Sequence, residues 1–170
     1  MGWDAIISGE LKFPKGGLAK WKAAPASVPD RTWPSMIAMA VDASMYDEDP
    51  NVETVLEEIV EQDHWFGKIE VEDPTVRVAY NVDSSNYTMA AERVVRVVCA
   101  AAKAGAKGRV LFCDAGDALS GARFTGALLV LEGGQLKCED KDNDALAASD
   151  KTRIDEIVEA VIANAKSKRK

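Results

Sequence analysis

Two pairs of alternating apolar and polar segments, each joined by a short turn, constrain the fold of this 170-residue chain most strongly. Asp73-Pro74 separates the first pair, and Gly133-Gly134, a favoured turn between adjacent strands, separates the second. Strands joined in this way must pair antiparallel, because a parallel connection needs about a dozen residues or more. The segments expected to form these strands are 68–72, 75–83, 124–132 and 135–139.

Helical periodicity marks three further segments. In the clearest one, apolar residues recur at helical spacing from Val52 to Val60, glutamates occupy the other face, and Asn51 can cap the first turn. An Ala- and Val-rich helix over 87–104 is expected to be buried over more than half of its circumference. A last helix is expected to begin near Asp150. Helices with a single apolar stripe bury it against one face of a sheet.

The rest of the folded part contains two more strands and an irregular connection. Alternating residues predict a first strand over 5–13, and an apolar run predicts another over 109–113. Between the first strand and the acidic helix, 14–50 reads as a Pro- and Trp-containing connection with one short helix near 18–24. The pattern of 35–46 is compatible with a helix or with a buried strand, so the order of strands in the sheet stays open.

These elements predict an α+β two-layer sandwich. We expect a mixed, mostly antiparallel sheet of about six strands, with about three helices packed on one face. A chain of this length is typical of a single domain, here 1–170, and the basic tail 166–170 is expected to fray.

Composition narrows the classes of function and partner. The net charge of −7 disfavours binding to nucleic acid and suits a basic protein partner. Three widely spaced cysteines and a single histidine disfavour structural zinc and favour free thiols in a reducing compartment. No secretory signal and no apolar run of roughly 20 residues is present, so we expect a cytoplasmic protein that uses neither a membrane nor a cofactor. A monomer and a homodimer both remain open.

The segment VLFCDAGDALSGARFTG, residues 110–126, looks most like a catalytic loop. Cys113 could act as a nucleophile with Asp114 or Asp117, or with His64 brought in by folding. Two carboxylates beside a thiol oppose thiolate formation, however, and glycine and aspartate are typical of a loop between strands. We therefore expect a turn here, and these four residues form the runner-up catalytic group.

A second acidic segment resembles a calcium loop only in part. Asp140, Asp142 and Asp144 occupy the first three ligand positions. Ala145 stands where the loop needs glycine, and Lys151 stands where it needs a bidentate glutamate. The sequence therefore predicts a solvated loop and no metal site.

The sequence His64-Trp65-Phe66 links the acidic helix to the next strand. These residues could form an exposed anchor, since tryptophan is favoured at interface hot spots, or a hydrophobic plug at the end of the sheet. A cationic partner would be steered toward the negative charge beside them. The candidate binding residues are Glu53, Glu57, Glu58, Glu61, His64, Trp65 and Phe66.

The function expected from these patterns is non-catalytic protein binding. We favour an acidic inhibitor or immunity-type protein that neutralises a basic toxin or enzyme by surface recognition. One alternative is a small cytoplasmic enzyme that uses Cys113. The other is a self-associating structural subunit that uses an apolar rim of Trp3, Trp21 and Trp33.

Overall fold

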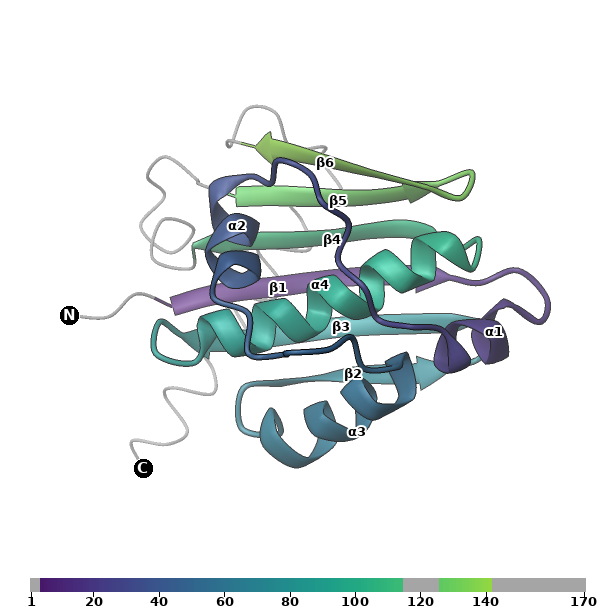
Figure 1. Cartoon of the computed structure of the whole chain (residues 1–170), viewed down its shortest axis with the longest axis horizontal. Coiled ribbons are helices and arrows are strands. Elements are labelled where there is room, and N and C mark those ends of the chain that lie inside the picture. The colour runs from purple at the N-terminus through teal and green to yellow at the C-terminus, as the bar shows by residue number, and fades with distance from the viewer. Residues whose placement is uncertain (1–3, 115–125, 142–170) are drawn as a thin grey trace, which may run out of the picture.

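A computed structural model describes residues 4–114 and 126–141, which form a six-stranded sheet with four helices packed against it. The strands lie in the order β2-β3-β1-β4-β5-β6, and every neighbouring pair is antiparallel (Figure 1). The strands are β1 Asp4–Lys12, β2 Gly67–Glu72, β3 Thr75–Asp83, β4 Lys107–Asp114, β5 Gly126–Glu132 and β6 Gln135–Lys141. The helices are α1 Gly17–Ala23, α2 Ser35–Asp42, α3 Val52–Gln62 and α4 Tyr87–Lys103.

Strand β1 organises the sheet from its centre. It pairs with β3 on one side and with β4 on the other, and both neighbours run antiparallel to it. Strands β3 and β4 therefore run parallel to each other, and α4, which connects them, crosses over β1 (Figure 1). This arrangement is a split β-α-β unit, with β2 added beyond β3 and with β5 and β6 added beyond β4.

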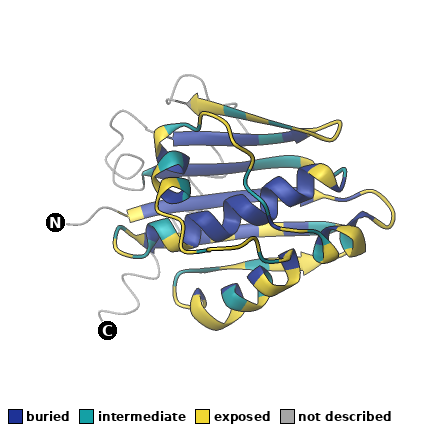
Figure 2. Ribbon diagram, viewed as in Figure 1, coloured by how far each residue is buried: buried dark blue, intermediate teal, exposed yellow. Residues whose placement is uncertain are grey.

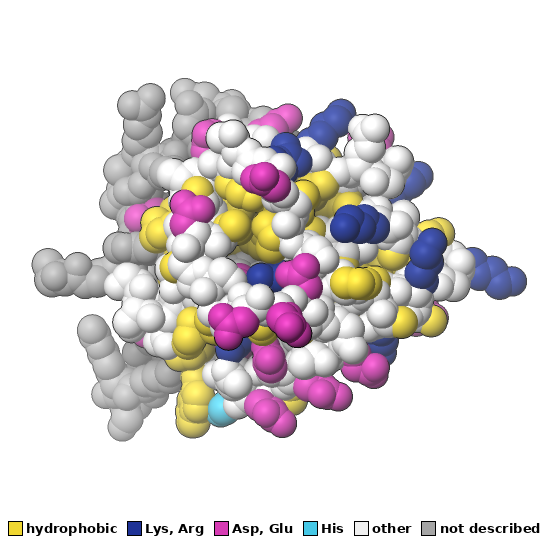
Figure 3. All heavy atoms as spheres, in the orientation of Figure 1, with side chains coloured by type: hydrophobic (Ala, Val, Ile, Leu, Met, Phe, Trp, Pro, Cys, Tyr) yellow, Lys and Arg dark blue, Asp and Glu magenta, His cyan; other side chains and the backbone are white. Residues whose placement is uncertain are grey.

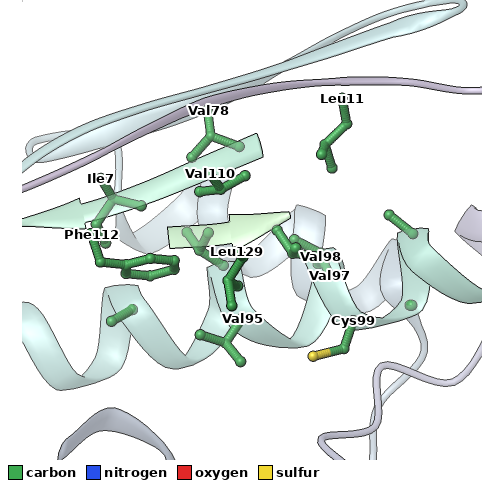
Figure 4. Packing of buried hydrophobic residues seen from close by; sticks show 14 of the residues in the cluster. Ile7, Leu11, Val78, Val95, Val97, Val98, Cys99, Val110, Phe112 and Leu129 are labelled. Carbon is green, nitrogen blue, oxygen red and sulfur yellow. The ribbon is translucent and has the colours of Figure 1, made fainter. Parts of the chain in front are cut away.

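Helix α4 supplies most of the core on the helical side of the sheet. Its residues from Ala90 to Ala102 are all buried, as the continuous dark ribbon of Figure 2 shows. Figure 4 shows the strand side chains that meet this helix, among them Val110, Phe112 and Leu129, with Val95 of α4 close to them. Small Ala and Val side chains let the helix lie close to the sheet, so the core is dense and apolar.

The two hairpin turns use the residues that the sequence indicated. Gly133 and Gly134 have φ angles of 60° and 76°, the left-handed conformation that a two-residue turn between twisted strands requires. The other turn, between β2 and β3, contains a cis peptide bond at Asp73-Pro74. Both hairpins place their second strand beside the first, as expected.

The structure confirms the predicted α+β class and corrects its details. The described sheet is antiparallel throughout, rather than mixed, and four helices pack against it instead of about three. The extra helix comes from 35–46, whose pattern was ambiguous and which forms α2 because Met36, Ile37 and Ala40 face the core together. The expected helix from Asp150 and the tail 166–170 lie outside the described residues, and the single domain over 1–170 remains a prediction.

Candidate functional site

Helix α3 lies along the β2 edge of the sheet and turns glutamates to solvent. The Asn51 side chain caps it by accepting a hydrogen bond of 2.8 Å from the Thr54 N–H. Its apolar side packs Val52, Val55 and Ile59 into the core. The opposite side exposes three carboxylates one helical turn apart, which make no ion pair within the described residues: Glu53, Glu57 and Glu61.

Glu58, the fourth predicted glutamate, belongs to a different environment. Its carboxylate accepts a hydrogen bond from the Tyr46 hydroxyl and lies 3.7 Å from the Arg93 Nε. These contacts join α3 to the loop before it and to α4. Burial and this hydrogen bond raise the pKa of Tyr46 to about 12, so the phenol stays protonated. Glu58 therefore holds the fold together, and the exposed acidic row consists of the other three glutamates.

An ion pair under the sheet edge fixes the end of α3. Arg93 of α4 donates to Asp63, the residue after α3, and the Tyr80 hydroxyl of β3 donates to the same carboxylate at 3.1 Å. Burial raises the pKa of the Asp63 carboxyl, and Arg93 and Tyr80 oppose part of this rise. Because Asp63 directly precedes His64, this contact positions the predicted anchor segment.

A second ion pair holds the loop between α2 and α3. Arg96 donates to Glu92 at 3.1 Å, to Asp49 at 2.8 Å and to the Ala26 carbonyl at 2.8 Å. The hydrogen bond from Arg96 lowers the pKa of Asp49. Asp49 is thus committed to an internal contact, although the sequence places it in an acidic run with Asp47 and Glu48.

The segment His64-Trp65-Phe66 divides between surface and core. The Trp65 side chain is 82% exposed, whereas Phe66 is half-buried and packs against the core. His64 is exposed; its Nδ1 lies 3.0 Å from the Glu61 carbonyl oxygen, and its ring centre lies 5.0 Å from that of Trp65. Phe66 therefore lies where the hydrophobic plug was expected, at the end of the sheet. Trp65 has the exposure that a binding anchor needs.

An open groove with an apolar lining separates α3 from β2. The sequence did not predict this groove. Leu56, Val60, Ile69 and Val71 line one hollow of about 370 Å³, with the three exposed glutamates and Lys22 around it. A second hollow of about 390 Å³ continues it, shares Val60 and Ile69 with the first, and reaches His64. We call this feature the α3–β2 groove. Figure 3 shows acidic side chains gathered over this part of the face, with the histidine beside them.

Within the described residues, the structure places His64 of the runner-up catalytic group far from Cys113. Cys113 lies on β4 opposite Ile6, is fully buried, and has its pKa raised to about 12 by that burial. His64 lies beside β2, three strands away in the sheet, which corresponds to roughly 14 Å at the usual strand spacing. Asp114 is half-buried at the end of β4, and Asp117 lies outside the described residues. A buried thiol whose pKa is raised in this way is a poor nucleophile.

The predicted tryptophan rim does not form as expected. Trp21 is fully buried, and its indole N–H donates to the Val97 carbonyl at 2.8 Å, so it belongs to the core. Trp33 is half-buried, with the guanidinium of Arg31 5.2 Å from the centre of its ring. Trp3 lies outside the described residues. The reason for the difference is that an indole offers one donor and a large apolar area, both of which a core position can satisfy.

Within 4–114 and 126–141, no three His, Cys, Asp or Glu side chains gather as metal ligands would. Asp140 is exposed at the end of β6, and Asp142 and Asp144 of the partial calcium pattern lie outside these ranges. None of the helices in the described part is long and apolar enough to cross a bilayer.

The sequence reasoning missed Glu92, Arg93 and Arg96. Their signal was present, since three ionisable residues stand in a helix expected to be buried over most of its circumference, and buried charges need partners. What the pattern could not supply was the identity of those partners, which come from three separate segments: Asp63, Asp49 and Ala26.

Comparisons with known proteins identify no relative of this chain. No protein-family model matches the chain, and neither the curated proteins nor the solved structures contain a significant match.

Proposed function

We propose that this protein is a non-catalytic binding module, an inhibitor or immunity-type protein that neutralises a basic toxin or enzyme by covering it with the acidic side of α3. The single observation that carries the proposal is the exposure of Trp65, at 82%, at the end of a row of three exposed glutamates. Tryptophan is highly buried on average in soluble proteins, and it is enriched among the residues that carry most of the binding energy at interfaces.

The contrast with the carboxylates that contact the arginines of α4 supports this interpretation. Asp63, Glu92 and Asp49 each contact an arginine of α4, and Glu58 contacts Tyr46 and Arg93. In the described part of the chain, Glu53, Glu57 and Glu61 make no ion pair. Their charge is available to a partner, and a basic surface is the complement.

The chemistry of such a partner follows from the same charges. A toxin or enzyme that acts on a polyanion must carry a cationic site, and an acidic surface can occupy that site in place of the substrate. Electrostatic attraction of this kind raises the association rate and weakens as salt is added. Trp65 would add the apolar contact that persists at high salt.

The test is an affinity capture from the source cell with two matched variants. The site variant carries Glu57→Lys, Glu61→Lys and Trp65→Ala. The control variant carries Asp30→Lys, Glu132→Lys and Trp33→Ala, which changes the net charge equally and removes one tryptophan away from α3. We expect the wild-type and control chains to retain the same basic protein, and the site variant to lose it.

The captured protein is then purified and its own activity is titrated with this chain. Stoichiometric inhibition by the wild-type and control chains, with none by the site variant, supports the proposal. Equal capture by both variants would place the binding surface elsewhere and overturn the proposal. Capture of a protein with an acidic contact surface, or one whose activity is unaffected, would do so as well.

A further inference from the structure

We infer that the α3–β2 groove receives an extended segment of the basic partner, which adds to the sheet as a seventh strand beside β2 and carries Lys or Arg at every second position. This inference rests on the proposed function and names the form of the ligand. It is carried by three features of the groove: a free strand edge, an apolar floor and a row of carboxylates with matching spacing.

The free edge follows from the hydrogen-bond alternation of the β2–β3 ladder. The Asn81 N–H donates to the Phe66 carbonyl at 2.7 Å, so this pair is a hydrogen-bonded one. In an antiparallel ladder such pairs alternate with pairs whose backbone groups point away from each other. The N–H and C=O groups of Ile69 and Val71 therefore point outward, whereas the Gly67 N–H already donates to the Asp63 carbonyl at 3.0 Å. Strand β2 has no further neighbour among the described strands.

The same residues turn their side chains toward α3. Ile69 pairs with Val78, and Val71 pairs with Val76. Val76 and Val78 face the helical core, so Ile69 and Val71 lie on the same side of the sheet, where they line the groove. A strand added to this edge would place the residues opposite Ile69 and Val71 on that face too, beneath α3. Its backbone would satisfy the free groups, and its alternate side chains would lie over Leu56 and Val60.

The spacing of the three glutamates along α3 matches the spacing of alternate side chains on an added strand, and so favours basic residues at those positions. Glu53, Glu57 and Glu61 recur every four residues, which is about 6 Å along a helix axis. Residues on one face of a strand recur about every 6.6 Å. Lys or Arg at every second position would therefore meet successive carboxylates. Their aliphatic stems would cover Val60, which is 72% exposed, while their charged ends reach the row.

The opposite edge of the sheet serves as an internal comparison. Strand β6 is also terminal among the described strands, and it carries Lys137 and Glu139 on one face and Asp140 on the other. Strand β2 has Lys68 and Glu70 on its other face, where they pair with each other at 2.5 Å and leave the groove side apolar.

The probe is a labelled peptide of about seven residues in which lysine alternates with threonine, long enough to lie along β2. Its affinity is measured by fluorescence anisotropy, and its position by amide shifts of the isotope-labelled full chain. A second peptide has methyl groups on the backbone nitrogens of its lysines. It keeps every charge but cannot donate to β2. A third has the same residues with the lysines grouped together.

The protein variants separate the backbone contact from the charge contact. Val71→Pro removes an outward N–H without removing a bond of the β2–β3 ladder, and Val71→Thr keeps that N–H with nearly the same shape. Glu57→Gln with Glu61→Gln removes charge from the row alone. We expect binding of the alternating peptide to the wild type and to Val71→Thr, with a loss of tenfold or more for Val71→Pro, for the methylated peptide and for the double glutamine variant.

Each other outcome overturns the inference and leaves the proposed function to its own test. If the double glutamine variant loses the peptide but Val71→Pro and the methylated peptide bind normally, the acidic row binds cations without strand addition. No binding of the alternating peptide at about 1 mM overturns the groove as its site. A dimer in light scattering that Val71→Pro dissociates would make a second copy of the chain the occupant. None of these results changes the capture experiment, which does not use the peptide.

Discussion

Helices α4 and α3 both carry several charged side chains, and they use them in opposite ways. On α4, Glu92, Arg93 and Arg96 are only 1%, 2% and 5% exposed, and each contacts a partner from another segment: the Met45 N–H, Asp63 and Asp49 respectively. On α3, three glutamates face solvent, and Figure 2 shows the helix exposed over much of its surface. Charge turned inward fixes the positions of loops and helix ends, whereas charge turned outward remains available for recognition.

Neighbouring residues of α3 show the same difference most sharply. Glu57 and Glu58 are adjacent and chemically identical, yet the first lines the groove and the second contacts Tyr46 and Arg93. A helix turns about 100° per residue, so consecutive side chains face different surroundings. Whether a carboxylate of α3 is structural therefore depends on the direction in which the side chain leaves the helix, and not on the residue type.

The largest effect is expected from breaking the buried pair. Arg93→Met leaves the Asp63 carboxylate buried without its counter-ion, so we expect the free energy of unfolding to fall by roughly 3–5 kcal/mol in urea denaturation. Adding Asp63→Leu should recover part of the loss, because it removes the unpaired charge. Arg77→Met, at an exposed pair with Glu10, is the control and should change far less. Equal losses of stability for Arg93→Met and Arg77→Met would contradict the distinction between buried, structural charges and exposed ones.

The next largest effect is expected at Trp65, next to the exposed side of α3. Trp65→Ala should weaken binding of the captured partner by about 2–4 kcal/mol, as expected for an aromatic hot spot, in isothermal titration calorimetry. The same variant should unfold at the wild-type urea concentration, because the side chain contributes little to the core. A large loss of stability with unchanged affinity would reverse the assignment and make Trp65 a structural residue.

The two adjacent glutamates provide the closest comparison. Glu58→Gln weakens contacts to Tyr46 and Arg93, so we expect a loss of roughly 1–2 kcal/mol in the free energy of unfolding. Glu57→Gln should stay within about 0.5 kcal/mol of the wild type. For partner affinity the order should be reversed, with Glu57→Gln the more damaging. Identical behaviour of the two variants in both measurements would remove the basis for separating them.

The smallest effect concerns the dependence of stability on pH. The pKa of Asp49 is lower in the folded chain because Arg96 donates to its carboxylate. Its stabilising contribution is therefore present above the unfolded pKa of about 3.9 and is lost as the pH falls through the lower, folded value.

Asp49 is half-exposed, so solvent screening limits the effect to roughly 0.5 kcal/mol at neutral pH. Asp49→Asn should lower stability by this amount at pH 7, and the difference should shrink as the pH falls below the unfolded pKa, in urea denaturation at each pH. A difference that persists unchanged in acid would show that the contact is not ionic.

The elements that could be predicted from the sequence are those whose pattern spans a whole element. The stripe from Val52 to Ile59 and the alternation of 75–83 each depend on many residues, and both elements formed close to the expected bounds. The segment 35–46 was ambiguous because its short apolar run fits two periods, and only its contact with the core made it a helix. Of the anchor residues, Trp65 is exposed and Phe66 packs against the core, and their role in binding stays a prediction.

The sequence by itself determined the α+β class, the two hairpins and the acidic side of α3, because periodicity and turn chemistry are local properties of the chain. Only the tertiary structure decided that Glu58 turns to Arg93, that Cys113 is buried far from His64, and that a groove opens between α3 and β2. Each of these depends on where segments distant in sequence come to lie. A side chain's partner is set by packing in three dimensions, which no local pattern records.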